Sequence, residues 1–294
     1  MNGLADQDLS IIFTALESQQ CVVFLGAGAC TAYPGTDGAQ NPGLPTGGEL
    51  AKVLAAQCQY ANGAYDLAKV AEHHVYFHGG NRQPLESALQ QQLQVPCQPR
   101  PIHTVLSQLN HIKIILTSNY DTLLETALTS QGRILTKHVH KPLDPRTGHF
   151  RGPFQFRDRE LVMHKMHGTI EDPESLVITQ SDYIQYLANL TDIDKGMPEY
   201  FRKQVIPQCS LLFLGYSLED WNFRVIWEGV LSTQTARSRA ITAYALMKSP
   251  SHFIRSYWLR RNIQIFDEDL TEFARKVAVK FTLDVPQLGI RRTP

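Results

Sequence analysis

Four short segments of the chain combine residues that could hold a phosphate with residues that could move a proton. They are Gly26-Ala27-Gly28, Ser118-Asn119-Tyr120-Asp121, His167-Gly168-Thr169 and Gly215-Tyr216-Ser217. Glycines let backbone N–H groups approach a pyrophosphate without interference from a Cβ atom, an amide can both donate and accept hydrogen bonds, and an imidazole can take up a proton. These residue types suit the binding of a phosphate-bearing molecule and acid–base chemistry on it.

Each of the four segments follows an apolar run that is typical of a buried strand. The runs are CVVFL (21–25), IKIIL (112–116), LVMHKM (161–166) and LLFL (211–214), and helix signals separate them. Continuous apolar strands alternating with helices predict a parallel sheet covered on both faces, which is a Rossmann-like α/β fold. Ligands of such sheets bind outside the carboxyl ends of the strands, so the four segments are expected to share one crevice.

Further strands are expected at the runs LVIT (176–179), AITAYAL (240–246) and IQIF (263–266). Helices are expected at 4–19, from about Tyr120, and in the segments SDYIQYLANL, DWNFRVIWEGVL, HFIRSYWLRR and LTEFARKVA. Residues 138–159 are rich in Pro, Gly, Arg and aromatic residues, which predicts an exposed loop or a short hairpin.

The stretch between the first two strands is helical in character and shows no strand signal. Its helical segments are ELAKVLAAQ, AYDLAKVAEHHVYF, LESALQQQL and IHTVLSQL. We therefore expect one catalytic domain over residues 1–294, with a Rossmann-like core formed by 1–48 and 111–294. Residues 49–110 are expected to form a helical insertion in that core.

Composition excludes several function classes. The chain of 294 residues has 28 Lys plus Arg and 28 Asp plus Glu, so no overall charge favours direct binding of nucleic acid or of an anionic membrane. The start MNGLADQDLS is acidic where a signal peptide is basic, and no apolar run approaches the roughly 18 residues of a membrane span, so we expect a cytoplasmic protein. Five cysteines without a Cys-x-x-Cys pair predict neither a disulfide framework nor a zinc site.

Simpler explanations compete at each of these segments. A tight strand-to-loop turn explains Gly26 and Gly28 as well as phosphate binding does, because the third glycine of a dinucleotide fingerprint is missing. Ser118 and Asp121 have the spacing of a helix capping box, as do Thr46 with Glu49 and Ser217 with Asp220.

The capping explanation leaves Asn119 and Tyr120 unexplained. A lone histidine such as His167 is most often a surface or satisfied core residue, and the neighbouring His164 and Lys165 are expected to be neutral to function. If Asn119 faces His167 across the crevice, the segment 118–121 is expected to form part of a catalytic site and not only a helix cap.

Taken together and in order, the motifs resemble the sirtuin-like (Sir2-type) family of NAD-consuming domains. The matching segments are GAGAC (26–30), GLPTGGEL (43–50), TSNYDTLLE (117–125), KMHGTI (165–170) and FLGYSLED (213–220). ITQSDYIQYL (178–187) is similar to a segment of the bacterial antiphage-defence branch, which lacks the zinc module. Each motif is modest, but the ordered set covers almost the whole chain.

The resemblance implies a role for each candidate residue. Catalytic roles fall to Asn119 and Asp121, beside the nicotinamide ribose, and to His167 as the base. NAD-binding roles fall to Gly26, Ala27 and Gly28 at the phosphate, to Gly215 and Ser217 at the phosphate or adenosine end, and to Thr46 of the GLPTGGEL segment. The residue that is usually serine is Cys30 in this chain. The zinc lobe of protein-deacylating relatives is replaced by helices, so no zinc or other metal is expected.

The first hypothesis is an NAD hydrolase that releases nicotinamide and ADP-ribose and acts as the effector of a bacterial antiphage defence system by NAD depletion. The alternatives are a protein deacylase or ADP-ribosyltransferase, and a non-catalytic module that senses NAD or ADP-ribose. The presence of both Asn119 and His167 argues against the sensing module.

The resemblance also implies partners. Related domains work with a sensor such as a hexameric DNA-translocating ATPase or an Argonaute-like protein. Because the chain ends about where the catalytic domain ends, we expect any sensor to be a separate protein. An enzyme that destroys NAD must be silent until it is triggered, so we also expect a homo-oligomer, with no direct contact to nucleic acid or membrane.

Overall fold

The computed structural model describes residues 3–61, 63, 65–140, 159–190, 205–218, 223–224, 227 and 243–291. Most of the loop or hairpin expected at 138–159 therefore lies outside the described residues. The same holds for most of the helix expected near DWNFRVIWEGVL and for Asp220.

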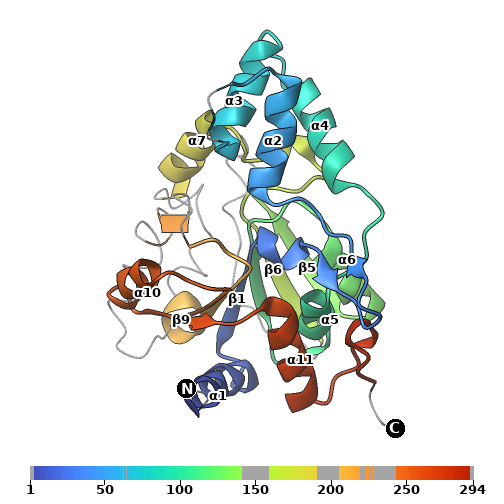
Figure 1. The fold of residues 1–294 in the computed structure, drawn as a ribbon, viewed down its shortest axis with the longest axis vertical. Coiled ribbons are helices and arrows are strands. Elements are labelled where there is room, and N and C mark those ends of the chain that lie inside the picture. Colours follow the sequence, from blue (N-terminus) through green and yellow to red (C-terminus); the bar gives the residue numbers. More distant parts are fainter. Residues whose placement is uncertain are drawn as a thin grey trace.

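A seven-stranded parallel sheet forms the centre of the described structure (Figure 1). Its strands, in spatial order, are β5 (Ile134–Val139), β6 (Glu160–Lys165), β4 (Ile114–Thr117), β1 (Cys21–Leu25), β7 (Ser210–Leu214), β8 (Ala243–Met247) and β9 (Ile263–Asp267). Strand order changes direction at β1, because β4 and β6 lie on one side of it and β7 to β9 on the other. The predicted α/β, Rossmann-like sheet is confirmed.

Residues of β1 alternate between two hydrophobic cores. Val23 and Leu25 pack on the face covered by α1 (Gly3–Glu17), α5 (Pro101–Gln108), α6 (Leu123–Ser130) and α11 (Leu270–Lys280). Val22 and Phe24 pack on the opposite face with residues of α7 (Gln180–Leu190) and α10 (His252–Leu259). Burial on both faces is the reason that this strand reads as an uninterrupted apolar run.

Three helices form a separate small core above the carboxyl ends of the strands, at the top of Figure 1. They are α2 (Gly47–Gln57), α3 (Leu67–Phe77) and α4 (Gln83–Leu93), and we call them the helical cap. Helix α2 begins with the predicted capping box, in which Thr46 and Glu49 satisfy each other's backbone N–H groups. Helix α5 follows in sequence but contributes Ile102 and Val105 to the core of the sheet. The limits of the insertion remain a proposal.

Three expectations need correction. Strand β5 was not expected, because it is an edge strand whose half-exposed Thr136, Lys137 and His138 break the apolar pattern. The run at 176–179 pairs with no strand of the described sheet, although the Val177 N–H donates to the carbonyl of His167. Helix α6 begins at Leu123, three residues after the expected start.

The remaining short elements connect the layers and lie mainly at strand ends. They are the ribbon of β2 (Tyr33–Pro34) and β3 (Gln40–Asn41), and the 3-10 turns η1 (Ala27–Cys30), η2 (Pro173–Ser175), η4 (Ile206–Gln208) and η6 (Pro286–Leu288). In the part of the chain that the structure describes, no helix is long and apolar enough to cross a membrane.

Candidate active site

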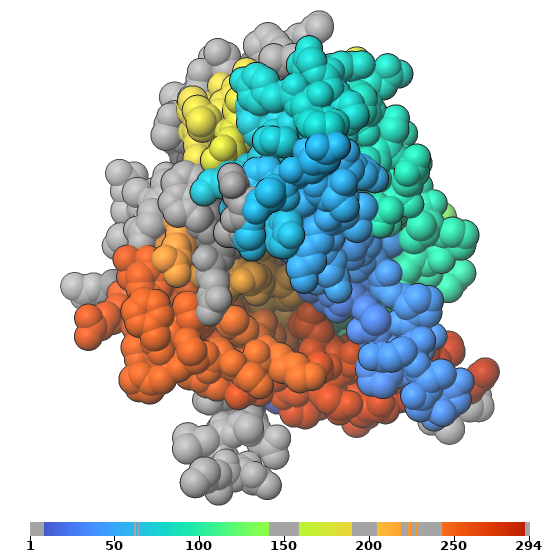
Figure 2. Space-filling model, turned by 45° about the horizontal axis from the view of Figure 1, so that its top comes forward, coloured from blue at the N-terminus to red at the C-terminus, as the bar shows by residue number. Residues whose placement is uncertain are grey.

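A cavity of about 790 Å³ lies where the ends of β1, β4, β6 and β7 meet the helical cap. Figure 2 views the molecule from the side on which the cap, in blue and cyan, approaches the carboxyl-terminal segments in orange. Eight of the nine predicted site residues line the cavity: Ala27, Gly28, Thr46, Asn119, Asp121, His167, Gly215 and Ser217. Gly26 is not among the lining residues and lies behind the wall. The structure thus gathers the predicted residues at one edge of the sheet.

The glycines at the ends of β1 and β7 pack directly against each other. A Cβ atom on Gly26 would lie 2.7 Å from the carbonyl oxygen of Gly215, and one on Gly28 would lie 2.9 Å from it. Gly215 has φ +71°, a left-handed conformation that suits glycine. The N–H of Gly28 donates to the carbonyl of Gly215, and that of Gly26 donates to Leu214. Close packing of two strand ends therefore explains these glycines, and phosphate binding by the turn remains a proposal.

The amide of Asn119 is held in one orientation by the end of β1. Its Nδ2 donates to the carbonyl oxygen of Gly26 at 3.1 Å and to Sγ of Cys30 at 3.3 Å. Its backbone N–H donates to Oγ1 of Thr117 at 3.0 Å. Because the two acceptors use both hydrogens of the amide nitrogen, the group left over is Oδ1, which is buried and has no hydrogen-bond partner among the described residues. Asn119, which lines the cavity, thus keeps one acceptor atom without a partner among the described residues.

A chain of hydrogen bonds links this amide to the start of α6. The thiol of Cys30 donates to Oδ2 of Asp121 at 3.1 Å, and Oδ1 of Asp121 accepts from the N–H of Leu123 at 2.9 Å. Burial, reinforced by the Asp121 carboxylate, raises the pKa of the Cys30 thiol well above its ordinary value. The sulfur therefore keeps its proton and can donate to the carboxylate while it accepts from Asn119.

The predicted capping box of Ser118 and Asp121 is wrong. The cap residue of α6 is Thr122, and its side chain makes no capping hydrogen bond. Asp121 does accept from the first turn, but from its position just before the cap residue. What orients Asn119 is therefore contact with β1 and Cys30, between residues about 90 positions apart in sequence.

His167 lines the same cavity as Asn119 and lies in a buried aromatic setting. Its side chain is 5% exposed, and its Nε2 has no hydrogen-bond partner among the described residues. The rings of Tyr183 and Tyr186, both from α7, are nearly perpendicular to the imidazole, and the centroid of each ring lies 5.2 Å from the centroid of the imidazole. Burial, with a smaller effect of His140, lowers the pKa of His167 to about 3. The imidazole is therefore neutral near pH 7 and able to accept a proton.

Three features of the site were not expected from the sequence. Tyr183 and Tyr216 line the cavity, and the aromatic content of their segments was the only signal for them. Lys165 is only 1% exposed and contacts the turn that carries Asn119, although it was expected to be neutral to function. A lysine inside an apolar run is the signal that could have revealed it.

The described residues offer no ready metal site. No group of three or more His, Cys, Asp or Glu side chains in the described ranges could hold a metal ion. All five cysteines are free, and Cys30 is engaged with Asp121 and Asn119. We therefore assign no step of the chemistry to a metal.

Comparison with known proteins adds independent information. The family model described as SIR2-like domain matches residues 113–266, just over half of the chain. The NAD(+) hydrolase ThsA of Acinetobacter baumannii is 30% identical over 162 residues, which cover 55% of this chain and 30% of that protein. ThsA of Bacillus cereus is 24% identical over 286 residues, 95% of this chain and 55% of that protein.

A defence-associated sirtuin also matches. Defense-associated sirtuin 2 of Bacillus subtilis is 24% identical over 164 residues, 54% of this chain and 15% of that protein. This chain therefore spans about half or less of the length of each of these relatives. The matched range 113–266 contains Asn119, Asp121, His167, Gly215 and Ser217.

Proposed function

Because the chain belongs to the SIR2-like family, we propose that it is an NAD hydrolase, which cleaves the bond between nicotinamide and ribose to give nicotinamide and ADP-ribose. The observation that carries the proposal is that Asn119 and His167 line the same cavity and each keeps a buried polar atom without a partner among the described residues, Oδ1 of Asn119 and Nε2 of His167. Relatives named NAD(+) hydrolase support the choice of substrate.

The two atoms suit the attack of water on the ribose. Nicotinamide leaves NAD as a neutral molecule, so its departure needs little help from an acid, and the ribose carbon becomes electron-poor. Water adds to that carbon and releases one proton. Oδ1 of Asn119 can accept a hydrogen bond from the water or from a ribose hydroxyl and hold it in place. His167 can take the proton, a contribution of roughly 10² to 10⁴ in rate.

A low pKa makes His167 a weak base, and the bound substrate is expected to raise that pKa. A neighbouring anion favours the protonated imidazole, so the pyrophosphate of bound NAD raises the pKa of His167 from its value of about 3. We place the phosphates along Ala27, Gly28, Gly215 and Ser217, with support from their shared position on the cavity wall. Both carboxylate oxygens of Asp121 are already engaged, which supports an orienting role for that residue.

The direct test is to incubate the purified protein with NAD and follow nicotinamide by chromatography. We expect nicotinamide and ADP-ribose to appear in equal amounts, without an added peptide, from the protein alone or in the presence of candidate sensor proteins. Nicotinamide that forms only with an acylated peptide would favour the deacylase. Bound NAD that is never cleaved, with or without candidate partner proteins, would favour the sensing module and contradict our proposal.

Exchanging Cys30 tests the hydrogen-bond chain that orients Asn119. Cys30→Ser keeps a donor to Asp121 and an acceptor for Asn119, so we expect kcat within about threefold of the parent protein. Cys30→Ala removes both contacts and frees the amide to rotate, so kcat is expected to fall about tenfold with KM little changed, in line with the loss of about one hydrogen bond. Steady-state kinetics with matched melting curves measure both. Equal activity of the two variants would show that Cys30 does not orient the amide.

Beyond the reaction, we propose a biological setting in which the protein depletes NAD during antiphage defence. The name of the Bacillus subtilis relative supports a defence role. We also propose a cytoplasmic homo-oligomer whose activity waits for a separate sensor protein, since unregulated hydrolysis of NAD would harm the host. Light scattering after size-exclusion chromatography tests the oligomer, and a monomer at micromolar concentration would contradict it.

A further inference from the structure

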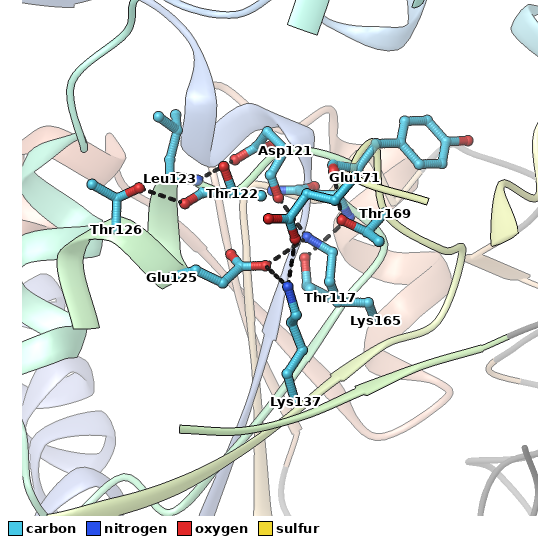
Figure 3. A network of polar contacts seen from close by, with 12 residues as sticks. Thr117, Asp121, Thr122, Leu123, Glu125, Thr126, Lys137, Lys165, Thr169 and Glu171 are labelled. Atoms are coloured by element: carbon cyan, nitrogen blue, oxygen red, sulfur yellow. Dashed lines mark hydrogen bonds and ion pairs between the residues drawn. The ribbon is translucent and has the colours of Figure 1, made fainter. Parts of the chain in front are cut away.

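Lys165 places a buried positive charge directly beneath the proposed catalytic residues. Its side chain is 1% exposed, and it lies at the end of β6, two residues before His167. Its Nζ donates to the backbone carbonyl of Asp121 and to Oε1 of Glu125, the latter at 3.0 Å. Figure 3 shows the ammonium between the turn that precedes α6 and the first turn of that helix. The lysine therefore joins two segments of the site.

Stability alone does not account for this lysine. Removal of an ammonium group from water costs several kcal/mol, and a buried ion pair often stabilises a fold no better than well-packed apolar side chains do. Apolar residues would also suit the end of a strand buried on both faces. An apolar residue at this position could not donate a hydrogen bond to a backbone carbonyl, whereas the lysine does. The acceptor is the carbonyl oxygen of Asp121, two residues after Asn119.

Backbone hydrogen bonds already tie the same two segments on either side of the lysine contact. The N–H of Met166 donates to the carbonyl of Thr117 at 2.8 Å, and the N–H of Ile170 donates to that of Tyr120 at 2.9 Å. His167 lies between these two donors in sequence. The lysine ammonium adds a side-chain tie at the far end of the turn, so the turn cannot shift along β6 without breaking at least one of these hydrogen bonds.

We propose that Lys165 is a positioning residue, whose ammonium holds the turn 118–122 against the end of β6 and thereby sets the spacing between Asn119 and His167. This inference rests on the proposed hydrolysis of NAD for its effect on rate, but the fixed geometry of the turn can be measured without catalysis. It also reverses the expectation from sequence that Lys165 is neutral to function.

Lys165→Met is the main test, because methionine keeps the length of the side chain and removes the donor. Glu125 does not become an isolated charge in this variant, since its side chain is 13% exposed and Lys137 lies 3.9 Å away. We expect kcat to fall about 10- to 100-fold with KM within about threefold, because small displacements of reacting groups cost rate more than binding. In hydrogen exchange, amides of residues 118–122 are expected to exchange faster.

Lys137→Met is the matched control. Lys137 belongs to the same charged network, with contacts to Glu125 and to Glu171, but it is 30% exposed and does not touch the turn. We expect its kcat to stay within about twofold of the parent protein and the exchange of residues 118–122 to be unchanged. If this control loses as much activity as Lys165→Met, the general charge of the network matters and the proposal is wrong.

Two further variants separate the contacts of Lys165. Glu125→Gln keeps the donor to the Asp121 carbonyl, so we expect a loss of kcat smaller than threefold. The double variant Lys165→Met/Glu125→Leu removes the ion pair without an unpaired charge and serves if the single variant does not fold. We expect it to keep the low kcat and the fast exchange. Parent-like kinetics and exchange in the folded methionine variants would overturn the role of Lys165. Parent protein that releases no nicotinamide, with or without candidate partner proteins, would instead overturn the proposed function, and the hydrogen-exchange result would then test the role of Lys165 alone.

Discussion

Replacing His167 by alanine is expected to lower kcat for NAD hydrolysis by roughly 10² to 10⁴, the usual contribution of a general base. The side chain is buried, its Nε2 has no hydrogen-bond partner among the described residues, and its low pKa keeps it neutral. Release of nicotinamide, measured under saturating NAD, gives kcat directly. The affinity for ADP-ribose, measured by calorimetry, is expected to change by less than about threefold.

Asn119→Asp is the companion to this variant. Aspartate has nearly the same size as asparagine but cannot donate to the carbonyl of Gly26 or to Cys30, so the side chain loses the contacts that orient it. We expect a loss of kcat similar to that of His167→Ala, measured at a temperature at which a melting curve shows that the variant is folded, since a buried carboxylate lowers the melting temperature. If nicotinamide release survives in both variants, Asn119 and His167 are not the catalytic pair.

Stability is expected to fall steeply as the solution is acidified below about pH 6.5. Burial lowers the pKa of the buried histidines, among them His103, to about 4, and His164 and His167, to about 3. Their pKa in the unfolded chain is near 6.5, so below that pH the unfolded state binds protons that the folded state does not. The free energy of unfolding is therefore fully retained above about pH 6.5 and decreases as the pH falls towards 4.

Each such histidine contributes at most about 1.4 kcal/mol per pH unit to the slope, so three contribute roughly 4 kcal/mol per unit at the steepest point. Urea denaturation at pH 7, 6 and 5 measures the slope. His164→Asn is expected to reduce it by up to about 1.4 kcal/mol per unit. The exposed His252 provides the control, since His252→Asn should leave the slope unchanged. A free energy of unfolding that is constant from pH 7 to 5 would contradict the burial of neutral histidines.

Local sequence patterns were sufficient to predict the fold class of this protein, although not every strand of its sheet. An uninterrupted apolar run such as CVVFL can be buried only if both faces of its strand are covered, and this requirement predicts a parallel sheet between helices. The carboxyl ends of parallel strands meet at one edge, so residues that follow four separate runs could be assigned to one cavity. The edge strand β5 escaped prediction because one side of it is solvent-exposed and polar residues are tolerated there.

Tertiary structure alone decided which atoms of the candidate site residues are engaged in hydrogen bonds. Asn119 bonds to Gly26, 93 positions away, and Asp121 bonds to Cys30, 91 positions away. Such contacts depend on β1 lying next to β4, and no local pattern encodes that neighbourhood. The packing of Gly26 and Gly28 on Gly215 and the contact of Lys165 with the turn also depend on the order of the strands, so they could not be predicted from local sequence. The sequence by itself predicted eight of the residues that line the cavity. The order of the strands decided which polar atoms of those residues have no hydrogen-bond partner among the described residues, because hydrogen bonds between neighbouring strand ends engage their remaining polar atoms.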